Sequence, residues 1–160
     1  MSEKKYELLL KSAEASPQQV AMAVSGLSPK DLGYKPSPGK WSILEILAHL
    51  ADVEIVFAYR LRGLLADKTP AIRPFDQEDW ATQLGYAETS APEMVAQYAL
   101  LRRSNLRLFR RLSTEDWLKG AIHPEFNRNF TVGDLLERMV DHSASHLKQI
   151  EALKRQASKG

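Results

Sequence analysis

The chain contains four long stretches in which apolar residues recur every three or four positions, the spacing that places them on one face of an α-helix. They cover about 2–25, 42–64, 90–112 and 131–156. Pro17 lies inside the first stretch and predicts a break or kink there. No segment shows sustained alternation or an Asn-Gly or Asp-Gly turn, so strands are not expected. The pattern predicts an all-α protein, and four long helices joined by loops favour a four-helix bundle.

Three of the four stretches begin with sequences typical of helix N-termini. Ser42 is followed three positions later by Glu45, which is the capping-box signature, and Thr131 is followed by Asp134 in the same way. The sequence at 90–93, Ser-Ala-Pro-Glu, combines a capping residue, an early proline and an acid. We therefore expect three of the helices to begin at these points.

The connections between the helices are long. The segments 31–40, 68–89 and 113–130 are rich in proline and glycine and carry no sustained periodicity, so they are predicted to be loops. A connection as long as 68–89 is typical of a segment that covers a functional site or a partner surface.

Composition indicates an ordinary soluble globular protein. The 160 residues are 44% hydrophobic and 26% charged, with a net charge of +2, which fits a single domain over 1–160 and gives no support to a nucleic-acid or membrane partner. There is no cysteine, so disulfides, thiolate nucleophiles and cysteine-bound metals are excluded. No apolar run reaches the length of a membrane span, and the short leucine cluster at 8–10 is too small for a signal peptide, so a cytoplasmic location is expected.

Three histidines interrupt the apolar faces of two predicted helices. His142 and His146 are four positions apart and lie on one face of the last helix, in the middle of an otherwise apolar stripe. His49 occupies the comparable stripe of the second helix. Buried imidazoles need partners, and a divalent metal would satisfy one nitrogen on each ring at once. Hydrogen-bonded core histidines remain the alternative.

The sequences around these histidines resemble those of the DinB-like superfamily. The matching motifs are WS at 41–42, EILAHL at 45–50 and HSASHLKQI at 142–150. The resemblance implies a four-helix bundle, often a homodimer, that holds one divalent metal, usually nickel or zinc, on a histidine triad. Carried onto this chain, the triad is His49, His142 and His146. Characterised members include S-transferases and isomerases that use low-molecular-weight thiols such as bacillithiol or mycothiol.

The resemblance therefore implies a metal-dependent enzyme acting on a small molecule, with thiol-dependent transfer ahead of hydrolysis. A low-molecular-weight thiol would then join the metal as a second cofactor. A non-catalytic metal-binding or interaction bundle is the competing interpretation, and a DNA-repair role is not carried over. An open metal position favours the enzyme, whereas a fourth protein ligand favours a structural site.

Several other polar residues are candidates for a role in the site. Asp52 and Glu45 are the weak candidates for orienting the triad histidines through their second ring nitrogen, although Glu45 is more simply a capping acid. His123 is expected to be a surface histidine, with a fourth ligand or a substrate contact as alternatives. Five arginines favour a solvent-exposed face of the third helix. A surface that binds nucleic acid, or a contact with an anionic substrate or thiol, is the alternative. The arginines are Arg102, Arg103, Arg107, Arg110 and Arg111.

Overall fold

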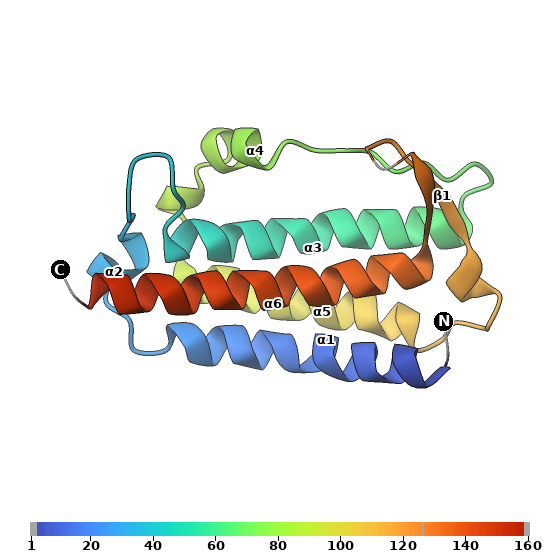
Figure 1. The fold of residues 1–160 in the computed structure, drawn as a ribbon, viewed down its shortest axis with the longest axis horizontal. Coiled ribbons are helices and arrows are strands. Elements are labelled where there is room, and N and C mark those ends of the chain that lie inside the picture. Colours follow the sequence, from blue (N-terminus) through green and yellow to red (C-terminus); the bar gives the residue numbers. More distant parts are fainter. Residues whose placement is uncertain (1–2, 126, 159–160) are drawn as a thin grey trace.

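The computed structural model describes residues 3–125 and 127–158 and is built around four long helices (Figure 1). The long helices are α1 (Glu3–Val24), α3 (Ile43–Ala66), α5 (Ala91–Phe109) and α6 (Val132–Ala157). Two short α-helices, two 3₁₀ turns and one β-hairpin join them: α2 (Pro29–Gly33), α4 (Gln77–Gln83), η1 (Tyr86–Glu88), η2 (Asp116–Leu118), β1 (Gly120–His123) and β2 (Arg128–Thr131). The architecture confirms the predicted four-helix bundle. No helix in the described ranges is both long and apolar enough to cross a membrane.

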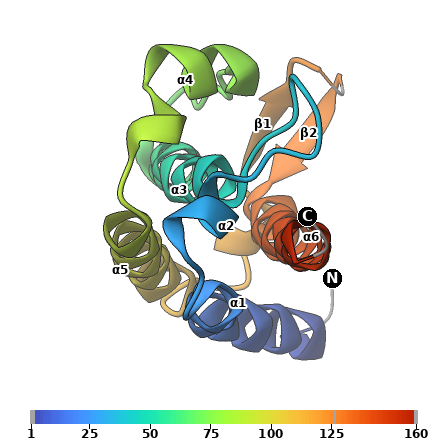
Figure 2. The ribbon, with the colours of Figure 1, turned by 90° about the vertical axis from the view of Figure 1, so that its left-hand side faces the viewer.

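The four helices do not follow one another around the bundle. Helix α1 packs against α5 and α6, and α3 packs against the same two helices, so the order around the bundle is α1, α5, α3, α6 (Figure 2). Helices α3 and α5 are neighbours that run in the same direction, and α1 and α6 form the other parallel pair (Figure 1). Neighbours that run in parallel cannot be joined by a short turn.

The long connection between α3 and α5 is therefore a return path along the outside of the bundle. It leaves the end of α3, passes lengthwise over the molecule, forms α4 and η1, and enters α5 at the opposite end (Figure 1). Helix α4 helps to fix the conformation of this connection. Asp76 caps the helix, because its side chain accepts hydrogen bonds from the backbone of Glu78 and Asp79. The prediction that 68–89 is only loop is wrong for this helical segment, which is too short to show a helical period.

Both helices that carry the predicted triad begin with a complete capping box. The Ser42 side chain accepts a hydrogen bond from Glu45 N, and the Glu45 carboxylate accepts one from Ser42 N. Thr131 and Asp134 make the same reciprocal pair at the start of α6. These contacts confirm two predicted helix starts. Ser90 makes no side-chain capping bond, so the expected cap of α5 is wrong although the helix does begin there.

Pro17 lies within α1 but does not end it, so the expected break does not occur. A proline cannot donate to the carbonyl four residues earlier, which here belongs to Ala13. That carbonyl instead accepts hydrogen bonds from the hydroxyl of Ser16 at 2.9 Å and from Nη1 of Arg102 at 3.4 Å. The carbonyl that Pro17 frees is thus satisfied by a polar network inside the bundle.

The connection between α5 and α6 contains a β-hairpin that the sequence pattern did not predict. Strands β1 and β2 pair antiparallel, with Gly120 opposite Thr131, and Asn127 adopts a positive φ of 46° near the turn. The strands are four residues each, and Ile122 points outward with 63% of its surface exposed while His123 points inward. Because the apolar residue is exposed and the polar residue is buried, the strand lacks the alternation that predicts a half-buried strand.

Candidate metal centre

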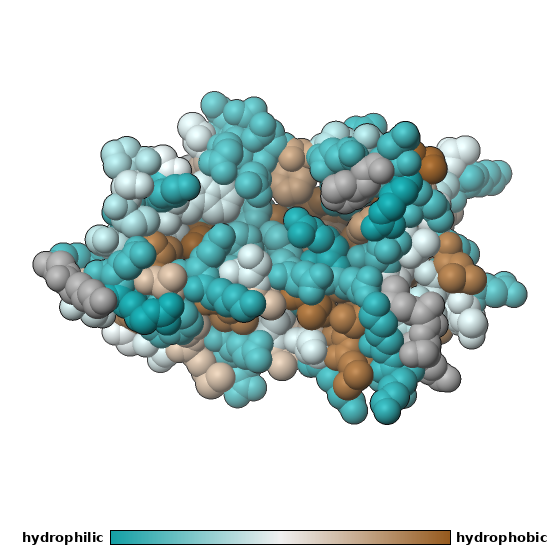
Figure 3. Space-filling model, viewed as in Figure 1, coloured by the Kyte–Doolittle hydropathy of each residue, from teal (hydrophilic) through white to brown (hydrophobic). Residues whose placement is uncertain are grey.

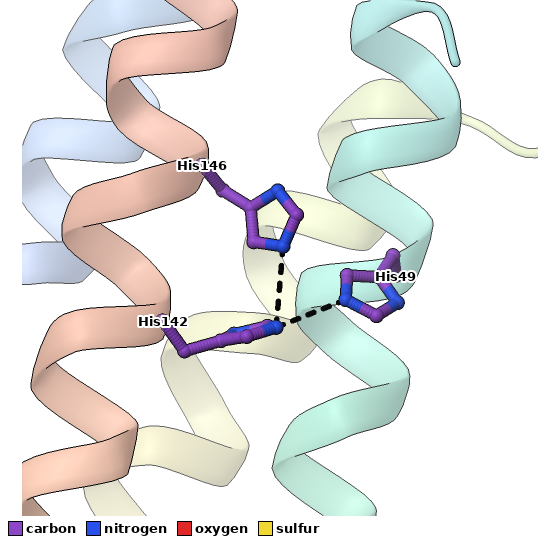
Figure 4. Close-up of side chains that lie close together, drawn as sticks. All are labelled: His49, His142 and His146. Carbon is purple, nitrogen blue, oxygen red and sulfur yellow. Dashed lines mark hydrogen bonds between the residues drawn. The ribbon is translucent and has the colours of Figure 1, made fainter. Parts of the chain in front are cut away.

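Helices α3 and α6 bring three imidazole rings to one point inside the bundle (Figure 4). His49 comes from α3, and His142 and His146 come from successive turns of α6. The Nε2 atom of His142 lies 3.0 Å from Nε2 of His49 and 3.2 Å from Nε2 of His146. The three potential ligand atoms all lie within 4.8 Å of one another. The structure therefore brings together all three histidines that the sequence singled out.

The triad geometry fits a divalent metal ion. Zinc–nitrogen bonds of 2.0–2.1 Å in tetrahedral geometry place ligand nitrogens about 3.3 Å apart, close to the two Nε2 separations. Three neutral imidazoles cannot all satisfy one another, because each ring carries a single N–H. A cation at the centre would use all three lone pairs at once.

The protonation state of the histidines also suits a metal. Burial, reinforced by the neighbouring His146, lowers the pKa of His49 to about 3. Burial and the two other triad rings lower the pKa of His142 to about 2, and burial also lowers the pKa of His146. The rings are therefore neutral at pH 7, which is the form that binds a metal.

Neighbouring side chains hold two of the rings in place. Nδ1 of His146 lies 2.8 Å from Oε1 of Gln149, so the Nδ1–H donates there and Nε2 keeps its lone pair. The ring of His49 packs against Trp41, with centroids 4.8 Å apart, but its buried Nδ1 has no hydrogen-bond partner among the residues that the structure describes. Gln149 was missed as an orienting residue, although its position three residues after His146 is a readable signal.

The two carboxylates expected to orient the triad are engaged elsewhere. Asp52 accepts a hydrogen bond of 2.8 Å from the hydroxyl of Tyr86, which raises the Tyr86 pKa, with burial as the larger cause. Glu45 caps α3 and accepts a hydrogen bond of 2.7 Å from Lys35. Neither carboxylate forms a hydrogen bond with a triad histidine. The capping interpretation of Glu45 is therefore the one that the structure supports.

Two cavities flank the triad. One, of about 260 Å³, lies along α3, α6 and the hairpin and is lined by His49 and His142. The other, of about 360 Å³, lies along the loop before α3, the start of α4 and the second half of α6, and is lined by His146 and Gln149. No fourth histidine or carboxylate joins the triad within the described ranges. A metal on the three rings would therefore keep an open position beside space for a small molecule.

His123 is not the surface residue that the sequence suggested. It lies on β1, is 4% exposed, and lines the smaller cavity together with His49 and His142. Its Nδ1 accepts a hydrogen bond of 3.3 Å from the backbone of Glu125, and burial lowers its pKa. The short strand buries it, because alternate residues of β1 face the bundle.

The arginines of α5 divide into two groups. Arg102 is 1% exposed and forms a buried ion pair with Glu54, so the expectation of a solvated face is wrong for this residue. Arg103 and Arg107 are exposed, and Arg110 forms an exposed ion pair with Glu14. None of the five arginines lines the two cavities beside the triad.

A family model described as the DinB superfamily matches residues 12–150. The chain belongs to the DinB superfamily. Among curated relatives of this DinB protein, "Putative metal-dependent hydrolase YfiT" of Bacillus subtilis (strain 168) is 28% identical over 158 residues, covering 97% of the chain and 87% of the relative. A protein of Bacillus licheniformis, also named as a putative metal-dependent hydrolase, is 29% identical over 153 residues, covering 94% of the chain and 85% of the relative.

A solved structure shares the whole fold of this DinB superfamily member. YfiT from Bacillus subtilis superposes with a TM-score of 0.91 at 25% identity, covering 99% of this chain and 90% of that one. That protein is described as "a probable metal-dependent hydrolase with an unusual four-helix bundle topology". The topology described above, with parallel neighbours joined by a long return path, is thus shared with a known structure.

Proposed function

We propose that this chain is a metal-dependent enzyme in which His49, His142 and His146 hold one divalent ion that activates a nucleophile for attack on a small molecule. The observation that carries the proposal is the convergence of three neutral Nε2 atoms beside open space. Three protein ligands with a free position are typical of catalytic zinc sites, whereas structural sites use four. The ion supplies Lewis acidity and lowers the pKa of the nucleophile that it binds.

We propose that the nucleophile is an external low-molecular-weight thiol. The chain has no cysteine, so a thiolate must come from a second molecule. Among the described residues no carboxylate hydrogen-bonds to a triad histidine, which favours a nucleophile that needs little help from a protein base. A free thiol has a pKa of about 8.5, far below the value of about 15.7 for water, and therefore needs much less activation. Zinc and nickel are the metals that the proposal favours.

Hydrolysis is the second candidate. It is favoured by the relatives, which are named as putative metal-dependent hydrolases. Zinc can lower the pKa of a bound water to about 7, so water is within reach of the same site. Glu125 is the one carboxylate among the described residues that line the smaller cavity, and it would be the base for such a reaction.

Parallel assays distinguish the two reactions. Untagged protein loaded with zinc or nickel is tested with small thiols against alkyl halides and epoxides, and without thiol against esters, amides and phosphoesters. We expect thiol-dependent conversion that a chelator and His146→Ala abolish, and that exposed Lys148→Ala on the same helix leaves intact. Metal-dependent turnover without thiol would establish hydrolysis instead, and no metal-dependent turnover in either panel would contradict an enzymatic role.

A further inference from the structure

Two arginines from different helices line the smaller cavity beside the triad. Arg60 comes from the second half of α3 and Arg138 from the first half of α6, and His49 and His142 line the same cavity. On the face shown in Figure 3, hydrophilic residues border a recess between the α4 segment and the region of the hairpin.

Arg60 is held in place but is not fully satisfied. Its Nη2 donates a hydrogen bond of 2.7 Å to the carbonyl of Arg73 on the return path, which fixes the guanidinium. Its Nε atom is buried and has no hydrogen-bond partner within 3–125 and 127–158. A buried N–H on a charged group costs free energy when it is unpaired, and burial lowers the Arg60 pKa accordingly. An anion in the cavity would satisfy this donor.

Arg138 supplies a second, unengaged guanidinium. It lies four residues before His142 and therefore on the same face of α6, one turn from the triad. It is exposed, and no hydrogen bond or ion pair joins it to the described residues, in contrast to Arg110 and Arg128, which pair with acids. A guanidinium left free at the wall of a cavity is available to a ligand.

The charge of the cavity favours an anion. Its two arginines are opposed by one acid, Glu125, whose carboxylate attracts the Arg60 guanidinium. The wall is therefore net positive before any metal is bound. The planar guanidinium matches the oxygen pairs of carboxylates and phosphates.

We infer that Arg60 and Arg138 form an anion-binding subsite beside the triad, and that the substrate or thiol of this protein carries a carboxylate or phosphate group. The anionic group lies between the two guanidinium groups, and the reactive end of the same molecule reaches the position next to His49 and His142. This inference rests on the proposed function, which supplies the reason for a ligand at the triad. It adds the chemical class of that ligand.

Anion binding is measured directly by NMR. The full chain is labelled with ¹⁵N, and its arginine Nε–H signals are followed during titration with inorganic phosphate or with acetate, with KCl holding the ionic strength constant. Both metal-free and zinc-loaded protein are used. The Arg60 and Arg138 signals are assigned from Arg60→Gln and Arg138→Gln.

We expect saturable shifts of these two signals in wild-type protein. Loss of a charge-assisted hydrogen bond should weaken anion binding about tenfold in Arg60→Gln and in Arg138→Gln. The control Arg107→Gln removes an exposed arginine outside the cavity and should leave the affinity unchanged. Glu125→Gln should tighten binding, because it removes the opposing carboxylate. The tighter of the two probes identifies the group that the subsite prefers.

If the arginine signals do not shift, the anion has no binding site there and the subsite is overturned. If Arg138→Gln and Arg107→Gln weaken anion binding equally, the attraction is only a diffuse effect of net charge, which also overturns the subsite. Arg138 is exposed, so its variant tests the inference even if Arg60→Gln fails to fold. Metal content is determined on the same samples. Normal metal binding without anion binding overturns the subsite alone, whereas anion binding without metal binding overturns the proposed function alone.

Discussion

Replacing Arg102 by methionine tests the buried polar network that joins the four long helices. The Arg102 side chain is 1% exposed and donates from Nε and Nη2 to Oε1 of Glu54 at 3.0 and 2.7 Å. It also donates to the hydroxyls of Ser16 and Ser143, both at 2.9 Å, while Asn105 donates to the other Glu54 oxygen at 3.0 Å. The partners lie on α1, α3, α5 and α6, so one guanidinium connects the whole bundle.

The expected loss of stability follows from the burial of Glu54. Removing one partner of a buried ion pair costs about 3–5 kcal/mol, because the remaining charge keeps its desolvation penalty. Ser16 and Ser143 both keep hydrogen bonds to the hydroxyl of Tyr98, so their contribution to the loss is small. The free energy of unfolding of a domain is only about 5–15 kcal/mol. The Arg102→Met protein should therefore fold but keep only a small free energy of unfolding.

The assay is urea unfolding followed by circular dichroism at pH 7. Arg103→Met, at the exposed neighbouring position, is the control and should change the unfolding free energy by no more than about 0.5 kcal/mol. Adding Glu54→Met to Arg102→Met should recover part of the loss, because an apolar pair replaces an unpaired charge. A cost below about 1 kcal/mol for Arg102→Met, or a further loss in the double variant, would contradict the stabilising role assigned to this buried ion pair.

Three further predictions concern the site and the helix starts. Gln149→Leu should weaken metal binding by about 10–100-fold in a chelator competition titration, because Gln149 orients the ring of His146. The control Gln156→Leu, at a position that also lines the larger cavity, should leave the metal affinity unchanged. Equal metal affinities of the two variants would exclude orientation of the triad by Gln149. In metal-free protein the pKa of His49 is about 3 when folded and near 6.5 when unfolded, so its contribution to stability is complete above pH 6.5 and is lost as the pH falls. Urea unfolding should show a loss of about 2 kcal/mol from this residue between pH 6.5 and 5, and His49→Phe should flatten the dependence. Ser42→Ala should cost about 0.5–2 kcal/mol of thermal or urea stability, whereas Ser90→Ala, which removes no capping bond, should cost almost nothing; equal costs would contradict the assigned caps.

The helices were predictable because their signals are local. The capping boxes at Ser42 and Thr131 were read directly from the sequence, and the structure confirms both. The direction of α5 relative to α3 has no such local signal, because it depends on which helices pack together. The hairpin escaped detection because its strands are four residues long and bury His123 rather than Ile122.

The candidate site was predictable as far as spacing on one helix could reveal it. The interval between His142 and His146 places both rings on one face of α6, and the structure brings His49 to them. The cavity walls depend on tertiary packing, so Arg60 and Arg138 were missed, although Arg138 shares a face with His142. The competing roles of Asp52 and Glu45 could not be separated without knowing their hydrogen-bond partners.

The metal content of the purified protein decides whether the three histidines hold one divalent ion. The chain is purified without an affinity tag and analysed for metals beside His49→Ala, His142→Ala, His146→Ala and the control His123→Ala, which alters a histidine outside the triad. We expect about one divalent ion per chain in wild type and His123→Ala, and loss of the ion in each triad variant with helicity retained. Wild-type protein without bound metal in zinc- or nickel-supplemented buffer, or triad variants that keep it, would contradict the claim.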